Sequence, residues 1–170
     1  YEPRSFNMGI SKEAFQATGG FGRIHPGEDP DLSIRLKEMG YHLHLIPEAF
    51  VFHKRRITLE SFYTQVNKFG QARPILNKWH PQSKRLTYWF PTFFTLGLIL
   101  SSVLSVIGFH WFLACYGLYF LVAMIGAFRA SNNIIVAFLV LPAIVIQFFG
   151  YGFGFLKATL KLGLSSKNET

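Results

Sequence analysis

From Tyr88 to Leu156 the chain carries a single charged side chain, Arg129. Within this stretch three apolar runs follow one another, at about 88–109, 111–128 and 134–155. Each run is close to the ~20 residues that an α-helix needs to cross the hydrocarbon core of a bilayer. The alternative, a buried helical hairpin of a water-soluble protein, would carry more charge. We therefore predict an all-α transmembrane region of about three helices.

The other charges of the chain lie almost entirely outside this region. Residues 1–87 hold 13 of the 17 Lys and Arg residues and 8 of the 9 Asp and Glu residues. This distribution predicts a water-soluble part at 1–87, a membrane part at 88–156 and a polar tail at 157–170. Because the chain begins with Tyr1 rather than methionine, we expect it to be a fragment or a processed piece.

The basic residues around the apolar runs predict the orientation in the membrane. Three of them lie just before the first run and one between the second and third runs: Lys78, Lys84, Arg85 and Arg129. The positive-inside rule therefore places the soluble part in the cytoplasm. Three spans would however export a tail that contains three lysines. Either the third run is re-entrant, or the stronger upstream signal overrides the tail, which is the alternative we favour.

The segment directly before the first run is strongly basic. Residues 54–85 hold 8 Lys and Arg residues against one acidic residue, Glu60, and aromatic side chains are interleaved with them. Such a segment suits membrane lipids with an anionic surface, and it would equally suit a lipid-linked phosphate. We expect no nucleic-acid partner, because the membrane spans already explain where the charge lies.

Two helix starts can be recognised in the soluble part from their capping residues. Ser11 can cap a short helix that ends at Gly19-Gly20. Asp29 is predicted as the N-cap of a second helix, with Pro30 in its first helical position. Gly40 is predicted to end this second helix.

The residues that follow predict two short strands and a third helix. Tyr41–Ile46 alternates between polar and apolar side chains, and Ala49–His53 has the composition of another strand. The third helix is predicted to begin at Thr58 and to be limited by Pro74.

The segments "SFNMGISKEAFQATGGF", "GEDPDLSIRLKEMGY", "IPEAFVFHKRR" and "HKRRITLESFYTQVNKFGQAR" occur in this order. Together they resemble the second half of the catalytic domain of family 2 glycosyltransferases, in particular bacterial members with C-terminal membrane helices. The resemblance covers about residues 5–85. It implies an α/β fold, the second half of the GT-A nucleotide-sugar transferase fold. The half that binds the nucleotide is not in this sequence, so the chain would supply the acceptor side of a site.

The resemblance also implies a function and a location. The protein would be a multi-pass enzyme of the bacterial inner (cytoplasmic) membrane, with its catalytic part facing the cytoplasm. It would transfer a sugar, of hexosyl type, from a nucleotide-sugar donor to a lipid-linked or cell-envelope glycan acceptor, with inversion. The alternative is a non-catalytic, membrane-anchored binding or scaffold protein with a degenerate transferase half-domain.

The acidic pair Glu28-Asp29 is the first candidate for catalysis. In the family, the aspartate of such a pair accepts the proton of the acceptor hydroxyl, and Asp29 matches this position. A weak nucleophile needs such a base in the transition state, and a helix N-terminus keeps a carboxylate ionised. Capping and catalysis are thus compatible roles for Asp29. Glu28 is expected to orient the loop or the acceptor.

His53 is the candidate ligand of a divalent metal, Mn²⁺ or Mg²⁺. In several enzymes of this fold a histidine after the corresponding strand binds the metal that holds the diphosphate, and imidazole binds Mn²⁺ readily. The alternative is a surface histidine beside a basic turn. His42 and His44 have a ligand-like spacing, but we interpret them as one solvated face of a strand.

Two further groups of residues are candidates for substrate binding. Gly19, Gly20 and Phe21 form a turn that permits close approach of a ligand, although a helix C-cap also explains a glycine there. The second group is Arg55, Arg56, Gln65 and Arg73. The arginines could pair with a diphosphate or a lipid phosphate, with a solvated basic face as the alternative for each, and Gln65 and Arg73 resemble the Gln/Arg motif of processive members. Pro74 stands where that motif has a tryptophan, which argues against polymer synthesis.

Overall fold

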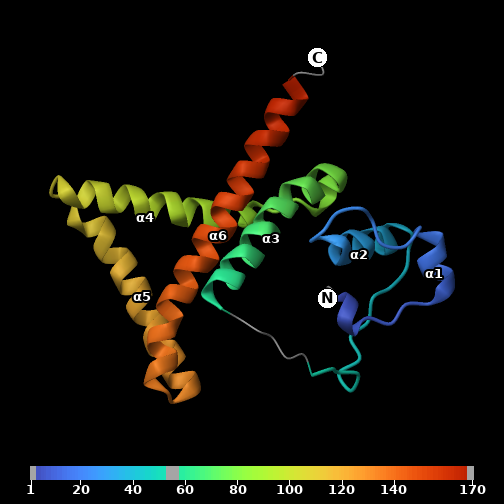
Figure 1. The fold of residues 1–170 in the computed structure, drawn as a ribbon, viewed down its shortest axis with the longest axis horizontal. Coiled ribbons are helices and arrows are strands. Elements are labelled where there is room, and N and C mark those ends of the chain that lie inside the picture. The colour runs from blue at the N-terminus through green and yellow to red at the C-terminus, as the bar shows by residue number, and fades with distance from the viewer. Residues whose placement is uncertain (1–2, 53–57, 168–170) are drawn as a thin grey trace.

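The computed structural model describes residues 3–52 and 58–167, in which helices are joined by loops (Figure 1). The soluble part contains the 3-10 helices η1 (Ser5–Asn7) and η2 (Pro81–Ser83) and the α-helices α1 (Lys12–Ala17), α2 (Glu28–Glu38) and α3 (Leu59–Trp79), and the 3-10 helix η3 (Leu86–Trp89) leads into the apolar part. The apolar part contains α4 (Phe90–Val106), α5 (His110–Ser131) and α6 (Ile134–Lys167).

The predicted α/β fold class is wrong for the described residues, since they contain no strand. Tyr41–Ile46 alternates as a strand would, but no second strand pairs with it there. A strand is stable only when a neighbour satisfies its backbone groups. Instead, Tyr41 and Leu43 pack on a small cluster formed by α1 and α2, around Leu32 and Leu36. The pattern thus reflects one packed face of an irregular segment.

The two predicted helices at the start of the chain form, with one change at the second. Ser11 caps α1, since its Oγ accepts a hydrogen bond of 3.1 Å from the backbone N–H of Ala14. The prediction that Asp29 caps α2 is wrong, because the N-cap is Gly27, at φ 127°. A glycine adopts this backbone conformation without steric cost. Asp29 is therefore the second residue of the helix.

Helix α3 begins where predicted and continues further than predicted. Thr58 and Ser61 form a reciprocal capping box at its start. Pro74 does not end it, and the helix continues to Trp79. A proline removes one backbone hydrogen bond, but packing on both sides of Pro74 offsets this loss. Ala72 and Leu76 are both buried in a cluster with Ile24.

The apolar part contains three helices that are long and apolar enough to cross a membrane, as predicted. The candidate spans are Leu86–Val106, His110–Ser131 and Ile134–Leu164. No residue of α5 is buried within the described chain, as expected for a helix whose side chains face lipid. The last span is longer than predicted, because α6 continues beyond Phe155 to Lys167.

Helix α3 of the soluble part packs directly on α6 (Figure 1). Glycines permit this contact: a Cβ atom on Gly154 would lie 2.3 Å from the carbonyl oxygen of Asn67, and one on Gly70 would lie 2.3 Å from that of Tyr151. Asn67 also donates a hydrogen bond of 2.9 Å from Nδ2 to the carbonyl of Gly150. We call this contact the α3–α6 joint.

The start of α4 meets the same part of α6. Thr92 is buried and donates from Oγ1 to the carbonyl oxygen of Gly152, at 3.1 Å. A Cβ on Gly152 would lie 2.8 Å from the carbonyl oxygen of Pro91. Helices α3 and α4 therefore both contact α6 within the segment Gly150–Gly154, which fixes the soluble part relative to the apolar helices.

Candidate functional site: a cleft between α2, α3 and α6

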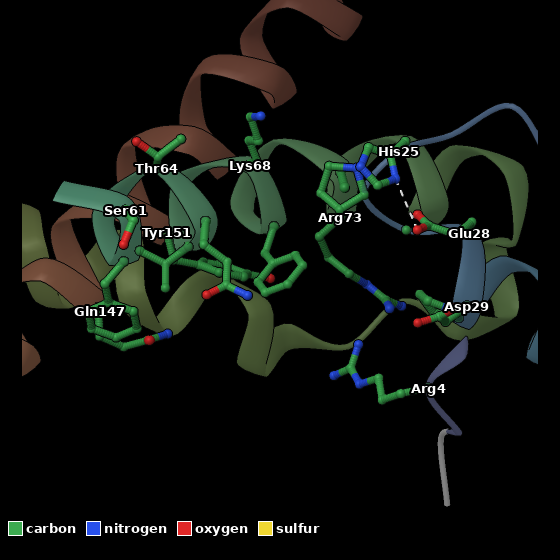
Figure 2. A pocket seen from close by; sticks show the side chains of 18 of the residues that line it. Arg4, His25, Glu28, Asp29, Ser61, Thr64, Lys68, Arg73, Gln147 and Tyr151 are labelled. Atoms are coloured by element: carbon green, nitrogen blue, oxygen red, sulfur yellow. Dashed lines mark hydrogen bonds and ion pairs between the residues drawn. The ribbon is translucent and has the colours of Figure 1, made fainter. Parts of the chain in front are cut away.

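One cleft, of about 1100 Å³, is lined by both the soluble part and the apolar helices (Figure 2). The N-terminal end of α2 forms one wall, α3 forms another, and α6 contributes Gln147 and Tyr151. Four residues predicted for catalysis or substrate binding line it: Glu28, Asp29, Gln65 and Arg73. These four are separated in sequence by up to 45 positions, and the fold brings them to one cavity.

Glu28 and Asp29 lie in the first turn of α2, each with one carboxylate oxygen that is buried and has no hydrogen-bond partner. These atoms are Oε2 of Glu28 and Oδ1 of Asp29. A buried acceptor without a partner is costly, and the partial positive charge of a helix N-terminus stabilises carboxylates there. Both residues line the cleft, and each of these two oxygens lacks the hydrogen bond that a carboxylate ordinarily accepts.

The second oxygen of Glu28 is already occupied. His25 Nδ1 lies 2.9 Å from Glu28 Oε1. Burial alone raises the pKa of Glu28, but hydrogen bonds from its own backbone N–H and from His25, together with the charge of His25, outweigh burial and lower it. Glu28 is therefore an ionised side chain at neutral pH, held in one orientation by its histidine neighbour.

Asp31 holds helix α2 in place from its buried side. Its side chain is 5% exposed; Oδ2 accepts hydrogen bonds from Arg35 Nε and Nη2, and Oδ1 lies 2.8 Å from His80 Nε2. Arg35 also donates to the backbone carbonyls of Thr18 and Gly20. One buried carboxylate thus connects α2 to the glycine turn after α1 and to the end of α3.

Arg73 is nine-tenths buried and is held in the cleft wall by three neighbours. Its Nε donates to Asn77 Oδ1 at 3.1 Å, its Nη2 donates to the carbonyl and hydroxyl oxygens of Ser83, and its guanidinium lies 3.9 Å from the centre of the Tyr88 ring. Figure 2 shows the guanidinium of Arg73 pointing toward Asp29, and the side chain of Arg4 extending into the same cleft. The acidic wall therefore faces cationic groups.

The other predicted site residues lie elsewhere. Gly19 and Gly20 do not line the cleft, and the Gly20 backbone is packed against the ring of Phe15. Phe21 lines a shallower neighbouring pocket, which it shares with Glu28. The predictions for His53, Arg55 and Arg56 fall outside the described residues.

The described residues alone do not fit a metal ion. They contain no group of three or more His, Cys, Asp or Glu side chains that could hold one. Glu28 and Asp29 are adjacent carboxylates, and the nearest imidazole, His25, is already bonded to Glu28. The predicted contribution of His53 lies outside the residues that the structure describes.

Several residues of this site have no mark in the sequence that identifies them. His80 follows a helix as an isolated histidine, and only the tertiary fold brings it to Asp31. Gln147 is a single amide within an apolar run. A signal did exist for Arg35, because Asp31 and Arg35 are four residues apart and thus share a helix face.

A family model described as "Glycosyl transferase family group 2" matches residues 6–149. Neither the curated proteins nor the solved structures give a match. The family match includes the acidic pair on α2, all of α3 and most of the apolar helices. Because it covers far more than half of the chain, the protein belongs to glycosyl transferase family group 2.

Proposed function

We propose that the protein is a membrane-anchored, inverting glycosyltransferase. It transfers a sugar of hexosyl type from a nucleotide-sugar donor to a lipid-linked or cell-envelope acceptor, at the cytoplasmic face of a bacterial inner membrane. The family match and the three apolar helices support a membrane-associated transferase. The observation that carries the proposal further is Asp29 Oδ1, a buried acceptor without a partner, at a helix N-terminus in a cleft.

In this proposal Asp29 is the general base. The acceptor hydroxyl donates a hydrogen bond to Asp29 Oδ1, and its proton moves to the carboxylate as its oxygen attacks the anomeric carbon of the donor sugar. The bond between the anomeric carbon and the diphosphate oxygen breaks, and the nucleoside diphosphate leaves with that electron pair. Attack from the side opposite to the leaving group inverts the anomeric centre.

The neighbouring residues position the reactants. Glu28, held by His25, orients the acceptor through its free oxygen. The guanidinium of Arg73, with that of Arg4, pairs with phosphate oxygens, for which a planar fork of donors is well suited. Gln65 lines the same wall as an amide donor and acceptor. Gly19, Gly20, Phe21, Arg55 and Arg56 stay predictions for substrate contact.

A divalent metal on the donor diphosphate remains part of the proposal, with His53 as its candidate ligand. In the full-length enzyme, His53→Ala should raise the Mn²⁺ or Mg²⁺ concentration needed for half-maximal transfer. An unchanged metal response at normal activity would make His53 a surface histidine.

The substitution Asp29→Asn tests the proposed base. Asn keeps the shape of the side chain but cannot take up a proton, and loss of a general base costs about 10²–10⁴-fold in rate. We expect a folded, membrane-inserted, donor-binding enzyme whose transfer is at least about a hundredfold slower. Melting temperature, donor binding and transfer should be measured on one preparation of the full-length protein.

The matched control is Glu13→Gln. Glu13 is likewise an acidic residue in the first turn of a helix, α1, but it is exposed and does not line the cleft. It should leave transfer unchanged. If Asp29→Asn transfers sugar as fast as the wild type, Asp29 is not the base. If the wild type transfers no sugar, the scaffold alternative replaces the enzyme.

A further inference from the structure

Helix α6 contains two polar side chains in a long apolar stretch, and both line the cleft. From Ile134 to Leu156 only Gln147 and Tyr151 carry a polar side-chain atom. They are four residues apart and so lie on the same side of the helix. This side faces the cavity that contains Asp29.

The amide of Gln147 has no hydrogen-bond partner within the described part of the chain, and the residue is exposed there. It lies inside the candidate span Ile134–Leu164. A polar group in hydrocarbon without a partner is unfavourable, so polar residues in spanning helices face cavities and mark substrate paths. Water or a ligand in the cleft must therefore satisfy this amide.

Toward its start, α6 carries exposed apolar side chains beyond the residues that line the cleft. Val136 lies about three turns before Gln147 on the same side of the helix, and Leu139 lies about two turns before it on an adjoining side. At the other end of the cleft are the carboxylates of α2. Along α6 toward α2, the protein thus presents an apolar surface, then the amide of Gln147, and then the carboxylates. An amphiphile has a matching order of parts: an apolar chain, a polar linkage and a polar head group.

The cleft has room for such a molecule and a fixed wall against the membrane helix. Its volume of about 1100 Å³ lies at the upper end of the range for small-ligand sites. The α3–α6 joint holds Ser61 and Thr64 of α3 and Gln147 of α6 in the lining of one cleft. A ligand head group could thus reach Asp29 while its chain stays against α6.

We propose that the acceptor is a lipid-anchored amphiphile that enters the cleft sideways from the bilayer along α6. Its apolar chain lies over Val136 and Leu139, and Gln147 hydrogen-bonds the polar linkage between chain and head group. The hydroxyl to be glycosylated then lies at Asp29. This inference rests on the proposed function and selects the lipid-linked acceptor over a water-soluble or polymeric glycan.

The test compares wild type with Gln147→Leu in the full-length, purified protein. A total lipid extract and a delipidated glycan fraction from the producing cells serve as acceptors, with radiolabelled nucleotide sugars as donors. We expect label in the organic-extractable product. Loss of one hydrogen bond should raise the KM for the lipid fraction by about fivefold to tenfold, with unchanged donor binding and a smaller effect on kcat. Gln147→Asn should recover part of the loss.

One further measurement tests the lipid site independently of transfer, and one control variant accompanies it. Native mass spectrometry should detect an amphiphile retained by the wild type and lost from Gln147→Leu. The control Cys115→Leu changes an exposed residue of α5 outside the cleft and should alter neither KM nor retention.

Transfer to the delipidated glycan alone, or equal KM values for wild type and Gln147→Leu, would overturn the inference and leave the transferase standing. Gln147-dependent retention without any transfer would keep the lipid site and overturn the proposed function. If the wild type shows neither retention of an amphiphile nor sugar transfer, both the inference and the proposed function are overturned.

Discussion

His80 Nε2 lies 2.8 Å from Asp31 Oδ1, and both side chains are buried. This contact joins the residue that follows α3 to the first turns of α2, which also carry Asp29. On its other side, His80 Nδ1 lies 3.4 Å from Glu38 Oε1, and Gln82 donates to the same oxygen. The imidazole therefore bridges both ends of α2 and sets its distance from α3.

The first prediction concerns this bridge. His80→Ala should lower the free energy of unfolding by about 1–3 kcal/mol, because it removes the buried partner of a carboxylate. Asp31→Asn should cost more, because Arg35 then also loses an anionic partner. Thermal unfolding in detergent, followed by tryptophan fluorescence, measures both. His44→Ala, at an exposed position, is the control and should melt with the wild type; equal melting of all four proteins would contradict the bridge.

The second prediction tests the α3–α6 joint. Gly154→Ala places a Cβ against the backbone of Asn67, and such overpacking costs about 1–3 kcal/mol. The melting temperature should fall, and transfer should fall with it because α3 forms a wall of the cleft. Gly163→Ala is the matched control on the same helix, since a Cβ there meets nothing within 4 Å. It should be neutral or slightly stabilising, and similar effects of both changes would argue against the joint.

The third prediction is a pH dependence set by Glu28. Its pKa is lowered in the folded protein from an ordinary value of 4.5, the hydrogen bonds from its backbone and His25 outweighing burial. A lowered pKa in the folded state gives stability that is present above the unfolded pKa and is lost as the pH falls through the folded pKa. The difference in melting temperature between wild type and Glu28→Gln should therefore shrink once the pH falls below 4.5.

The measurement is a series of thermal melts of both proteins from neutral pH to below that value. Glu13→Gln on α1 serves as the comparison, because Glu13 has no such histidine partner. If the difference in melting temperature between wild type and Glu28→Gln stays constant with pH, the ionised Glu28 side chain does not contribute the predicted stability. Transfer by Glu28→Gln at neutral pH should be reduced less than transfer by Asp29→Asn.

The fourth prediction concerns the side of the membrane on which the chain ends. Gly152 of α6 lies against Pro91, in the first turn of α4, and α6 continues from there to Lys167. In a simple bundle of three full spans, the end of α6 would lie opposite the start of α4. We therefore expect the tail on the same side as the soluble part, which requires an even number of crossings.

A cysteine at Ser166, in a Cys115→Ala background, can test this in sealed vesicles. An impermeant maleimide should label it from the same side as a cysteine at Lys37, an exposed residue of α2. Labelling of the two positions from opposite sides would restore three full crossings.

Features that depend on local chemistry were predictable from the sequence. Ser11 and Thr58 cap helices because their hydroxyls meet nearby backbone N–H groups, which spacing alone reveals. The apolar helices follow from composition. The strands predicted at Tyr41–Ile46 and Ala49–His53 are absent from the described residues of these segments, because a strand depends on a distant partner and the pattern of one segment does not supply it.

The residues of the candidate site also fall into two groups, those recognisable in the sequence and those that depend on the tertiary fold. Glu28 and Asp29 could be selected because a carboxylate pair before a proline is visible in the sequence. Their environment could not, since His80 and Gln147 reach the site only through the packing of α3 against α2 and α6. The extension of α3 past Pro74 has the same origin, because burial of its neighbours outweighs the local preference of proline.

The α3–α6 joint has a consequence for how the surrounding lipid acts on the protein. A spanning helix changes its tilt when the hydrocarbon thickness of the bilayer changes. Because the backbones of α3 and α6 are in close contact at Gly70 and Gly154, a change in the tilt of α6 must move α3. The cleft is lined by both helices, so the acyl-chain length of the membrane becomes a determinant of its width.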